Sequence, residues 1–473
     1  MANRPDQSRG DAVFKQVRQG ILAGALPGGA RLPPSRTLAG ELGVARQTVV
    51  GAYERLAAEG YVSARTGAGT YVAQDLPDAR PVPAAPAAST ATQLSRRGAA
   101  VAATPASAGV SGSLLAPGIP APELFPHRAW SSCMAAVSAG AAGRGYPDPQ
   151  GLPELRAAIA AHLAAVRGLV VRPESVLVTA GTQGALRVAA EILLDPGDTA
   201  WVEDPGYIAG RGCLQAAGAV LAPVPSDGAG LDVAAGVASA PGARLALVAP
   251  SHATPGGSAM PVGRRLALLA WADAAGASVL EDDCDAEFRW SGKPLPPLAA
   301  LDQAGRFIYC GTFSKTLAPA LRLGFAVLPD GLMPAAIRAR TLQDRGPPTL
   351  VQAALAEFMR RGLLAPHVRR MRTEYAARRA AVLDALARHC PAVQPLPAPG
   401  GLHMVLRLPG GTDEAAVAAA AAGRGLACAP YARYWAGTPD GPGLVIGFAS
   451  TPPALAPGAA RRLARSMGDA ATQ

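Results

Sequence analysis

The sequence contains almost no lysine: of its 44 basic residues, all but Lys15, Lys293 and Lys315 are arginine. No apolar run of about 18 residues is free of proline and charge, so a membrane span is not expected. The first residues are polar and lack the apolar core of a secretory signal. The six cysteines are scattered without a Cys-x-x-Cys pair, which argues against a disulfide scaffold or a structural zinc site. We therefore expect no metal site and a cytoplasmic location.

The composition is that of a folded protein with a large core. The chain has 473 residues, of which 49% are hydrophobic and 16% charged, and this length is typical of two or three domains. The formal net charge of +10 permits an acidic partner such as DNA but does not prove one.

One segment, residues 75–112, separates a small N-terminal part from a large C-terminal part. It holds twelve alanines and five prolines in 38 residues and shows no apolar period. Such a composition predicts a flexible to semi-extended linker. The expected domains are therefore residues 1–74 and residues 113–473.

The N-terminal part reads as three short helices followed by two short strands around a glycine-rich tip. Ser35 is a plausible N-cap of the second helix and Gly43 ends it. The third helix begins near Arg46 and leaves Arg46, Gln47 and Thr48 on its outside. This order predicts a winged helix, whose recognition helix enters the major groove by its polar N-terminal end. A protein-binding winged helix with a solvated polar face is the alternative.

The run LPPSRTLAGELGVARQTVVGAYERLAAEGYVSARTGAGTYV resembles the GntR-type winged helix-turn-helix of bacterial transcription regulators. The Pro-Ser-Arg entry, the Arg-x-Thr-Val helix and the Gly-x-Gly-Thr tip stand in the order of that family. The resemblance implies double-stranded DNA as a partner, with contacts from Arg36, Arg46, Thr48 and the wing near Gly67. Gln47 lies beside them in the sequence.

The large part alternates short apolar runs with alanine-rich helical segments, which predicts an α/β domain with a mostly parallel central sheet. The expected strands are Ser175–Thr179, Ala200–Val202, Leu245–Val248, Ser278–Leu280, Arg306–Tyr309 and Gly324–Leu328. Ligands of such sheets bind at the carboxyl ends of the strands. Motifs that directly follow these runs are therefore the candidate site residues.

Three of these motifs are ambiguous by themselves. Thr182 and Gln183 begin a helix after a strand, which could form an anion cradle or a plain loop. Tyr207 could stack on a ring or be a buried structural tyrosine. The acidic run Glu281–Glu287 could bind a metal or be a solvated loop, and Asp282 could instead pair with the protonated ring nitrogen of a pyridoxal cofactor.

The fourth motif, Gly311-Thr312-Phe313-Ser314-Lys315 with Arg322 beyond it, decides between these interpretations. A Schiff base requires a primary amine, which arginine cannot supply. A lone lysine is usually a surface charge, but Thr312, Ser314 and Arg322 are all suited to phosphate. In a chain that avoids lysine, Lys315 is interpreted as chemically required.

Together these residues resemble the fold type I aminotransferases over residues 113–460. That resemblance implies a smaller C-terminal α+β part, a homodimer, and an internal aldimine between Lys315 and pyridoxal 5′-phosphate. Asp282 would pair with the pyridine nitrogen, and Tyr207 would stack on the ring. The expected phosphate ligands are Thr182, Gln183, Thr312, Ser314 and Arg322, with Tyr146 reaching a phosphate in the partner subunit.

Three positions depart from the aminotransferase pattern. Cys284 replaces a tyrosine that would bond the phenolic oxygen, and a thiol is a weaker and shorter donor. Thr254 stands where asparagine is common, which leaves Thr254 and His252 as the candidates to compensate. Val445 stands where an arginine for the substrate carboxylate is expected, which leaves Arg211 and Arg433 as candidate effector ligands.

The whole chain resembles the MocR (GabR-type) subfamily of GntR regulators, in which a winged helix is joined to an aminotransferase-like domain. This resemblance implies a transcription factor that senses an amino compound, or the cofactor, through Lys315. Two alternatives remain: a working aminotransferase with an accessory DNA-binding module, and a cofactor-free scaffold that serves only to dimerise.

Overall fold

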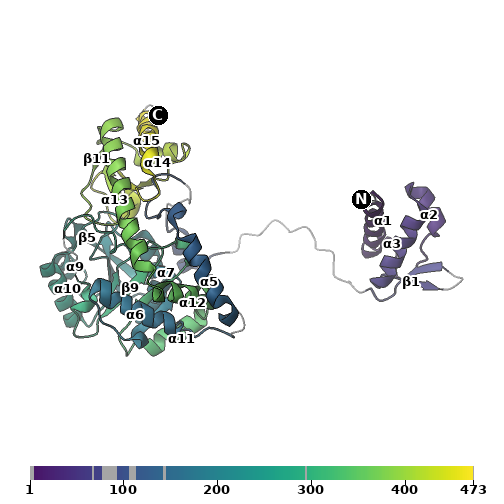
Figure 1. Ribbon diagram of the computed structural model, residues 1–473, viewed down its shortest axis with the longest axis horizontal. Coiled ribbons are helices and arrows are strands. Elements are labelled where there is room, and N and C mark those ends of the chain that lie inside the picture. Colours follow the sequence, from purple (N-terminus) through teal and green to yellow (C-terminus); the bar gives the residue numbers. More distant parts are fainter. Residues whose placement is uncertain are drawn as a thin grey trace. The chain divides into compact units, whose positions relative to one another are not determined.

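The computed structural model describes residues 5–65, 69–76, 93–105, 113–141, 145–292 and 296–471. The chain divides into two compact units, residues 1–93 and 94–473, whose elements are labelled in Figure 1. Among the described helices, none is both long and apolar enough to cross a membrane.

The first unit is a winged helix, as predicted. Its elements are α1 (Pro5–Leu22), α2 (Ser35–Leu42), α3 (Arg46–Ala58), β1 (Val62–Arg65) and β2 (Gly69–Val72). The strands pair antiparallel with Val62 opposite Val72. Val49, Tyr53 and Leu56 of α3 are buried against α1 and the strands, because their spacing places them on one face of the helix. Gly43 ends α2 in the left-handed conformation.

The segment expected to be a linker is partly helical. Helix α4 (Arg96–Ala102) begins at Ser95, whose hydroxyl accepts a hydrogen bond from the Gly98 amide at 3.0 Å. A Cβ at Gly212 of α8 would lie 2.7 Å from the Thr104 methyl carbon, so this segment packs on the second unit. The composition argument missed it because alanine, which left no apolar period, is also the strongest helix former. Residues 77–92 and 106–112 lie outside the described part.

An eight-stranded sheet forms the centre of the second unit, in the order β3-β10-β9-β8-β7-β4-β5-β6. Strands β9, β8, β7, β4 and β5 are parallel, and β10 is antiparallel to both of its neighbours. The strands are β3 (Val176–Thr179), β4 (Thr199–Asp204), β5 (Val220–Asp227), β6 (Gly230–Leu231), β7 (Leu245–Val248), β8 (Ser278–Asp282), β9 (Phe307–Thr312) and β10 (Gly324–Val327). The mostly parallel α/β sheet is therefore confirmed.

Helices cover both faces of this sheet, as Figure 1 shows. Leu280 packs with α7, α8 and α11 on one face, whereas its neighbour Val279 packs with α9 and α10 on the other. This alternation follows from the two-residue period of a strand. The helices are α5 (His127–Ala141), α6 (Pro153–Arg167), α7 (Gly181–Leu193), α8 (Ile208–Ala217), α9 (Val233–Ser239), α10 (Val262–Ala275), α11 (Met333–Gln343) and α12 (Thr349–Arg360).

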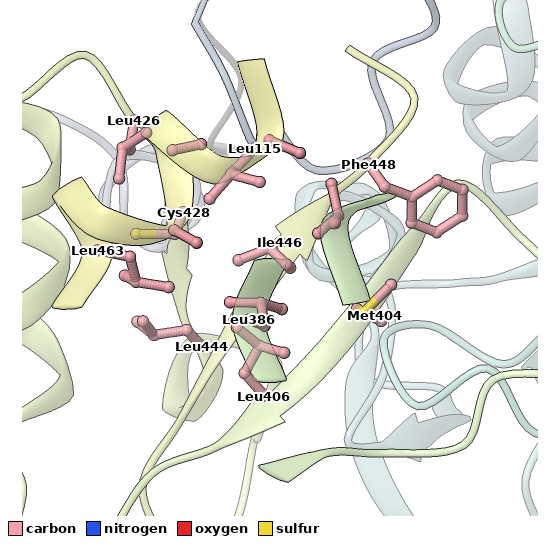
Figure 2. Packing of buried hydrophobic residues seen from close by; sticks show 14 of the residues in the cluster. Leu115, Leu386, Met404, Leu406, Leu426, Cys428, Leu444, Ile446, Phe448 and Leu463 are labelled. Carbon is pink, nitrogen blue, oxygen red and sulfur yellow. The ribbon is translucent and has the colours of Figure 1, made fainter. Parts of the chain in front are cut away.

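The C-terminal part is a smaller α+β layer with its own core. Its antiparallel sheet has the order β11-β12-β14-β13. Leu406, Leu444 and Ile446 of this sheet pack with Leu386 and Leu463 from two helices (Figure 2). The elements are α13 (Leu364–His389), β11 (Gln394–Pro395), β12 (His403–Arg407), α14 (Glu414–Ala422), β13 (Ala429–Pro430), β14 (Gly443–Gly447) and α15 (Ala456–Ala471).

Candidate functional site

The sheet brings the four chemical motifs of the large unit to one edge. Strands β3, β4, β8 and β9 run in the same direction, so their carboxyl ends lie along the same side. Helix α7 starts after β3, Tyr207 follows β4, Asp282 ends β8, and Lys315 follows β9. Motifs separated by up to about 130 residues in the sequence therefore share one edge, where ligands of such sheets bind.

The start of α7 has the features of an anion site. Gly181 has a φ of +71°, and a Cβ there would lie 3.3 Å from the Arg322 guanidinium. Arg322 donates to the Ala180 carbonyl at 2.9 Å. The Thr182 hydroxyl is buried and has no hydrogen-bond partner among the described residues. A helix N-terminus, an arginine and a free hydroxyl together suit a phosphate group.

Two further hydroxyls lie just before Lys315. Thr312 and Ser314 have their side-chain oxygens 3.0 Å apart, and the Ser314 amide donates to the Thr312 hydroxyl at 3.1 Å. These bonds fix the turn that leads from β9 to Lys315. The half-buried Lys315 donates from Nζ to the Gly118 carbonyl at 2.6 Å, which holds its amine against the segment that precedes α5.

Asp282 is a buried carboxylate, and its surroundings do little to offset the cost of burying its charge. Burial raises its pKa from 3.8 to about 7, and the Cys284 thiol, which donates to Oδ1 at 2.8 Å, opposes that rise. A protonated ring nitrogen beside Asp282 would stabilise the charged carboxylate. Tyr207 accepts a hydrogen bond from the Gln183 amide at 3.1 Å, and burial raises the pKa of its phenol.

The residues that depart from the aminotransferase pattern lie around the same edge. Thr254 precedes a cis peptide bond to Pro255 and shares the lining of a cavity of about 20 Å³ with His252, Asp282 and Cys284. Val445 is fully buried on β14 in an apolar cluster. The position expected to hold an arginine therefore supplies packing and no charge.

The two candidate effector arginines have different surroundings. Arg211 is buried and donates to the carbonyls of Tyr434 and Arg433, both at 2.8 Å. It also lines a cavity of about 10 Å³ with Tyr207 and Asp282. The side chain of Arg433 is exposed. Arg211 thus fixes the backbone that carries Arg433.

Two residues of the site were not identified from the sequence. Glu203 is the penultimate residue of β4 and is buried beside Asp282, and burial raises its pKa from 4.5 to about 8. Its position at a strand end was the available signal. Gly118, the hydrogen-bond partner of Lys315, lies 197 residues away in the sequence, and no local pattern marks such a contact.

Tyr146 is 82% exposed, and the Arg345 guanidinium lies over its ring at 4.6 Å. It is therefore not part of the cofactor edge of its own chain. An exposed aromatic residue of this kind is available to another subunit, which is the role expected for it.

The winged helix presents Arg36, Arg46 and Gln47 as exposed side chains. Thr48, expected on the outside, is buried instead, because the start of α3 packs on α1 and the Thr48 methyl faces Gly10. Ser35 does not cap α2; Arg46 donates to its hydroxyl at 3.4 Å. Gly67 lies outside the described residues.

Comparison with known proteins gives matches over both units. Residues 9–72 match the gntR family of bacterial regulatory proteins, and residues 124–435 match the aminotransferase class I and II family. The probable rhizopine catabolism regulatory protein MocR of Rhizobium meliloti is 38% identical, covering 93% of this chain and 90% of MocR. The pyridoxine biosynthesis transcriptional regulator PdxR of Corynebacterium glutamicum is 35% identical, covering 93% and 91%.

The fold of the large unit also matches solved aminotransferases. The structure of LysN, an α-aminoadipate aminotransferase of Thermus thermophilus complexed with N-(5′-phosphopyridoxyl)-L-leucine, has a TM-score of 0.72 and 28% identity. It covers 79% of this chain and 98% of LysN. The chain therefore belongs to the GntR family of bacterial transcription regulators, in the MocR-type group that joins a winged helix-turn-helix to an aminotransferase class I and II domain.

Proposed function

We propose that this protein is a cytoplasmic, homodimeric regulator that binds operator DNA and senses an amine or amino acid through pyridoxal 5′-phosphate at Lys315. One observation carries the proposal: the Lys315 amine, the buried Asp282 carboxylate and the anion site at the start of α7 lie at the same edge of the sheet. Because the same chain carries a DNA-binding winged helix, we infer that this chemistry serves to regulate transcription.

The residues at the sheet edge fit the cofactor. The unpartnered Thr182 hydroxyl, the α7 N-terminus and Arg322 would hold the phosphate, with Gln183, Thr312 and Ser314 beside them. Asp282 would hold a proton between its carboxylate and the ring nitrogen, and Tyr207 would cover the ring. When bound, pyridoxal phosphate supplies an aldehyde that condenses reversibly with primary amines.

The Lys315 amine connects this edge to the segment before α5. Its partner Gly118 lies in a segment that is also fixed to β14, because the Gly447 amide donates to the Leu115 carbonyl at 2.8 Å. An effector that changes the hydrogen bond of Lys315 would therefore act on this segment and on its contact with the C-terminal sheet. It would shift the protein between two states only if it binds them with different affinity.

We assign recognition of an effector carboxylate to Arg433 in place of the missing arginine at Val445. Arg433 is exposed, and Arg211 holds its backbone through the hydrogen bond to its carbonyl. For the dimer, the exposed Tyr146 is proposed to reach the phosphate of the partner subunit.

The test is a spectral titration of the full-length protein with a panel of amines and amino acids, combined with promoter binding. We expect an absorbance band of bound cofactor that shifts with the effector, and a parallel change in salt-dependent DNA affinity. Lys315→Ala should abolish both responses, whereas Lys293→Ala should keep them.

If Lys315→Ala keeps both the spectral response and the change in DNA affinity, the sensing proposal is wrong. Steady turnover of an amino donor with a keto acid would favour the aminotransferase instead. A protein that contains no cofactor and still dimerises on DNA would favour the scaffold.

A further inference from the structure

Three buried side chains from distant parts of the sequence meet beside Asp282 at the cofactor edge. His252 lies in the loop after β7, Asp285 in the turn after β8, and His403 at the start of β12. They are only 6%, 7% and 6% exposed. One candidate ligand atom from each lies within 4.8 Å of the other two, and the imidazole ring centroids are 5.1 Å apart.

Four of the six polar side-chain atoms of this cluster lack a hydrogen-bond partner among the residues that the structure describes. Both ring nitrogens of His252, Nε2 of His403 and Oδ1 of Asp285 have no hydrogen-bond partner within the described part of the chain. The His403 Nδ1 and Asp285 Oδ2 are 3.8 Å apart, too far for a hydrogen bond. Buried polar atoms are almost always bonded, and an unmade bond costs about 1–3 kcal/mol. A group between the three side chains would remove that cost.

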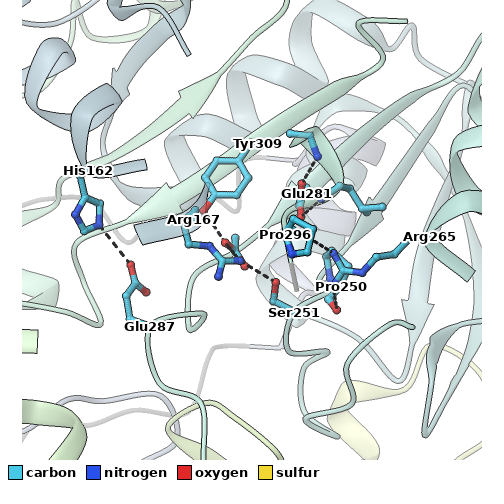
Figure 3. Close-up of polar contacts among 12 residues, drawn as sticks. His162, Arg167, Pro250, Ser251, Arg265, Glu281, Glu287, Pro296 and Tyr309 are labelled. Atoms are coloured by element: carbon cyan, nitrogen blue, oxygen red, sulfur yellow. Dashed lines mark hydrogen bonds and ion pairs between the residues drawn. The ribbon is translucent and has the colours of Figure 1, made fainter. Parts of the chain in front are cut away.

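Charged groups near this cluster make polar contacts, and Figure 3 shows those of Arg167, Arg265 and Glu281. Glu281 accepts from the amides of Leu298 and Ala299. Asp283 accepts from the Tyr309 hydroxyl at 2.5 Å and pairs with Arg167 at 2.7 Å. Glu281 and Oδ2 of Asp283 therefore have partners of their own, although Oδ1 of Asp283 has none within the described residues. Asp285 instead lies with Oδ2 at 3.8 Å from His403 Nδ1.

We infer that His252, Asp285 and His403 form a binding site for a divalent first-row transition metal ion, with Zn²⁺ as the expected occupant. Two imidazoles and one carboxylate are a ligand set that zinc accepts, with a water in the fourth position. Zinc ligands bind at about 2.0–2.2 Å, so the three side chains would need to move inward.

The surroundings leave room for the water ligand of the ion. A cavity of about 20 Å³ lies beside His252 and Asp285, enough for about one water molecule. Of the arginines that line it, Arg167 pairs with Asp283 and Arg265 donates to the carbonyls of Met260, Pro250 and Pro296. The guanidinium groups of Arg167 and Arg265 therefore already have partners. Two positive charges oppose a cation here, because, in addition to burial, Arg289 lowers the pKa of His252 and Lys315 lowers the pKa of His403.

The site would join two layers of the effector unit. His252 and Asp285 follow strands of the large sheet, whereas His403 belongs to the C-terminal sheet. Gly401 makes the approach possible, because a Cβ there would lie 1.8 Å from Nε2 of His252. A bound ion would therefore fasten the C-terminal sheet to the ends of β7 and β8, close to Asp282.

The test measures metal in the full-length protein, purified without a histidine tag, loaded with Zn²⁺ or Co²⁺ and freed of excess ion by gel filtration. We expect about one zinc per chain. Co²⁺ should give visible d–d bands of nitrogen and oxygen ligation without thiolate charge transfer. Asp285→Asn and His403→Gln should each lower the bound metal at least tenfold, whereas the exposed His127→Gln should keep it.

Cys284→Ser is the second control, because Cys284 borders the same cavity as His252 and Asp285. Loss of metal in this variant would overturn the ligand assignment, as would retention in His403→Gln. Should the ligand variants fail to fold, an anomalous difference map of zinc-soaked wild-type crystals decides. A peak between the three side chains is expected, and its absence overturns the site.

Discussion

The Lys315 amine is held by the Gly118 carbonyl at 2.6 Å, and a Cβ at Gly118 would lie 2.8 Å from Nζ. Gly118 also has a φ of +66°. The position of the reactive amine therefore depends on a residue without a side chain, far away in the sequence. Because this contact links the cofactor edge to the segment before α5, it is the first place to test the mechanism.

Gly118→Ala should displace the Lys315 amine and destabilise the protein. A positive φ costs an alanine about 1–2 kcal/mol, and the new methyl group would occupy the position of Nζ. We expect a lower thermal midpoint and a severalfold loss of bound pyridoxal phosphate, measured by absorbance after dialysis. Gly458→Ala on α15, where a Cβ meets open space, should keep the bound cofactor and should not lower the thermal midpoint, because alanine favours a helix over glycine. Full cofactor content in Gly118→Ala would show that the contact does not position the amine.

Glu203→Gln should change how stability depends on pH. Burial raises the pKa of Glu203 from 4.5 to about 8, so the folded protein binds this proton more tightly than the unfolded chain. Its contribution to stability is complete below pH about 4.5 and is lost as the pH rises through about 8, by up to about 1.4 kcal/mol per pH unit. The wild type should therefore lose stability relative to Glu203→Gln across this window in denaturant titrations. The exposed Glu174→Gln should follow the wild type, and parallel curves for wild type and Glu203→Gln would contradict the prediction.

Arg211→Ala and Arg433→Ala should separate structure from recognition. Removing the buried Arg211 leaves the carbonyls of Tyr434 and Arg433 without their donor, and we expect a loss of about 2–4 kcal/mol in the free energy of unfolding. Arg433 is exposed, so its removal should stay within about 0.5 kcal/mol while weakening the spectral response to amino acids. An unchanged response to amino acids would remove Arg433 from the effector site.

The sequence predicted the central sheet well because buried strands are continuous apolar runs. Strand β5 (Val220–Asp227) was not predicted, because it carries two prolines and is largely half-buried or exposed. Both features are typical of a strand near the edge of a sheet. Similarly, the composition of residues 75–112 concealed α4. The structure of both segments depends on the elements that pack against them, and the sequence of one segment does not show which elements those are.

The candidate site likewise has residues that could be predicted from the sequence and residues that could not. Asp282, Tyr207 and Lys315 follow strands, and their convergence could be predicted from parallel topology. The burial of Thr48 against α1 and the capture of Arg211 by carbonyls of residues 433 and 434 depend on packing between distant elements. The cluster of His252, Asp285 and His403 is of this kind too. The acidic run that holds Asp285 was visible in the sequence, but its two histidine partners lie in distant segments.

Arg46→Ala and Thr48→Val should affect DNA binding differently. Arg46 is exposed at the start of α3, and removing a phosphate or base contact there should cost about 1–3 kcal/mol of operator affinity. If Arg46 contacts a base, the preference for operator over unrelated DNA should fall. If it contacts a phosphate, the slope of log affinity against log salt should fall by about one.

Thr48 is buried, so Thr48→Val should lower the thermal midpoint of the winged helix and leave sequence preference intact. Fluorescence anisotropy with operator and scrambled duplexes at several salt concentrations measures both effects. Unchanged affinity and salt dependence in Arg46→Ala would place the recognition surface elsewhere on the winged helix.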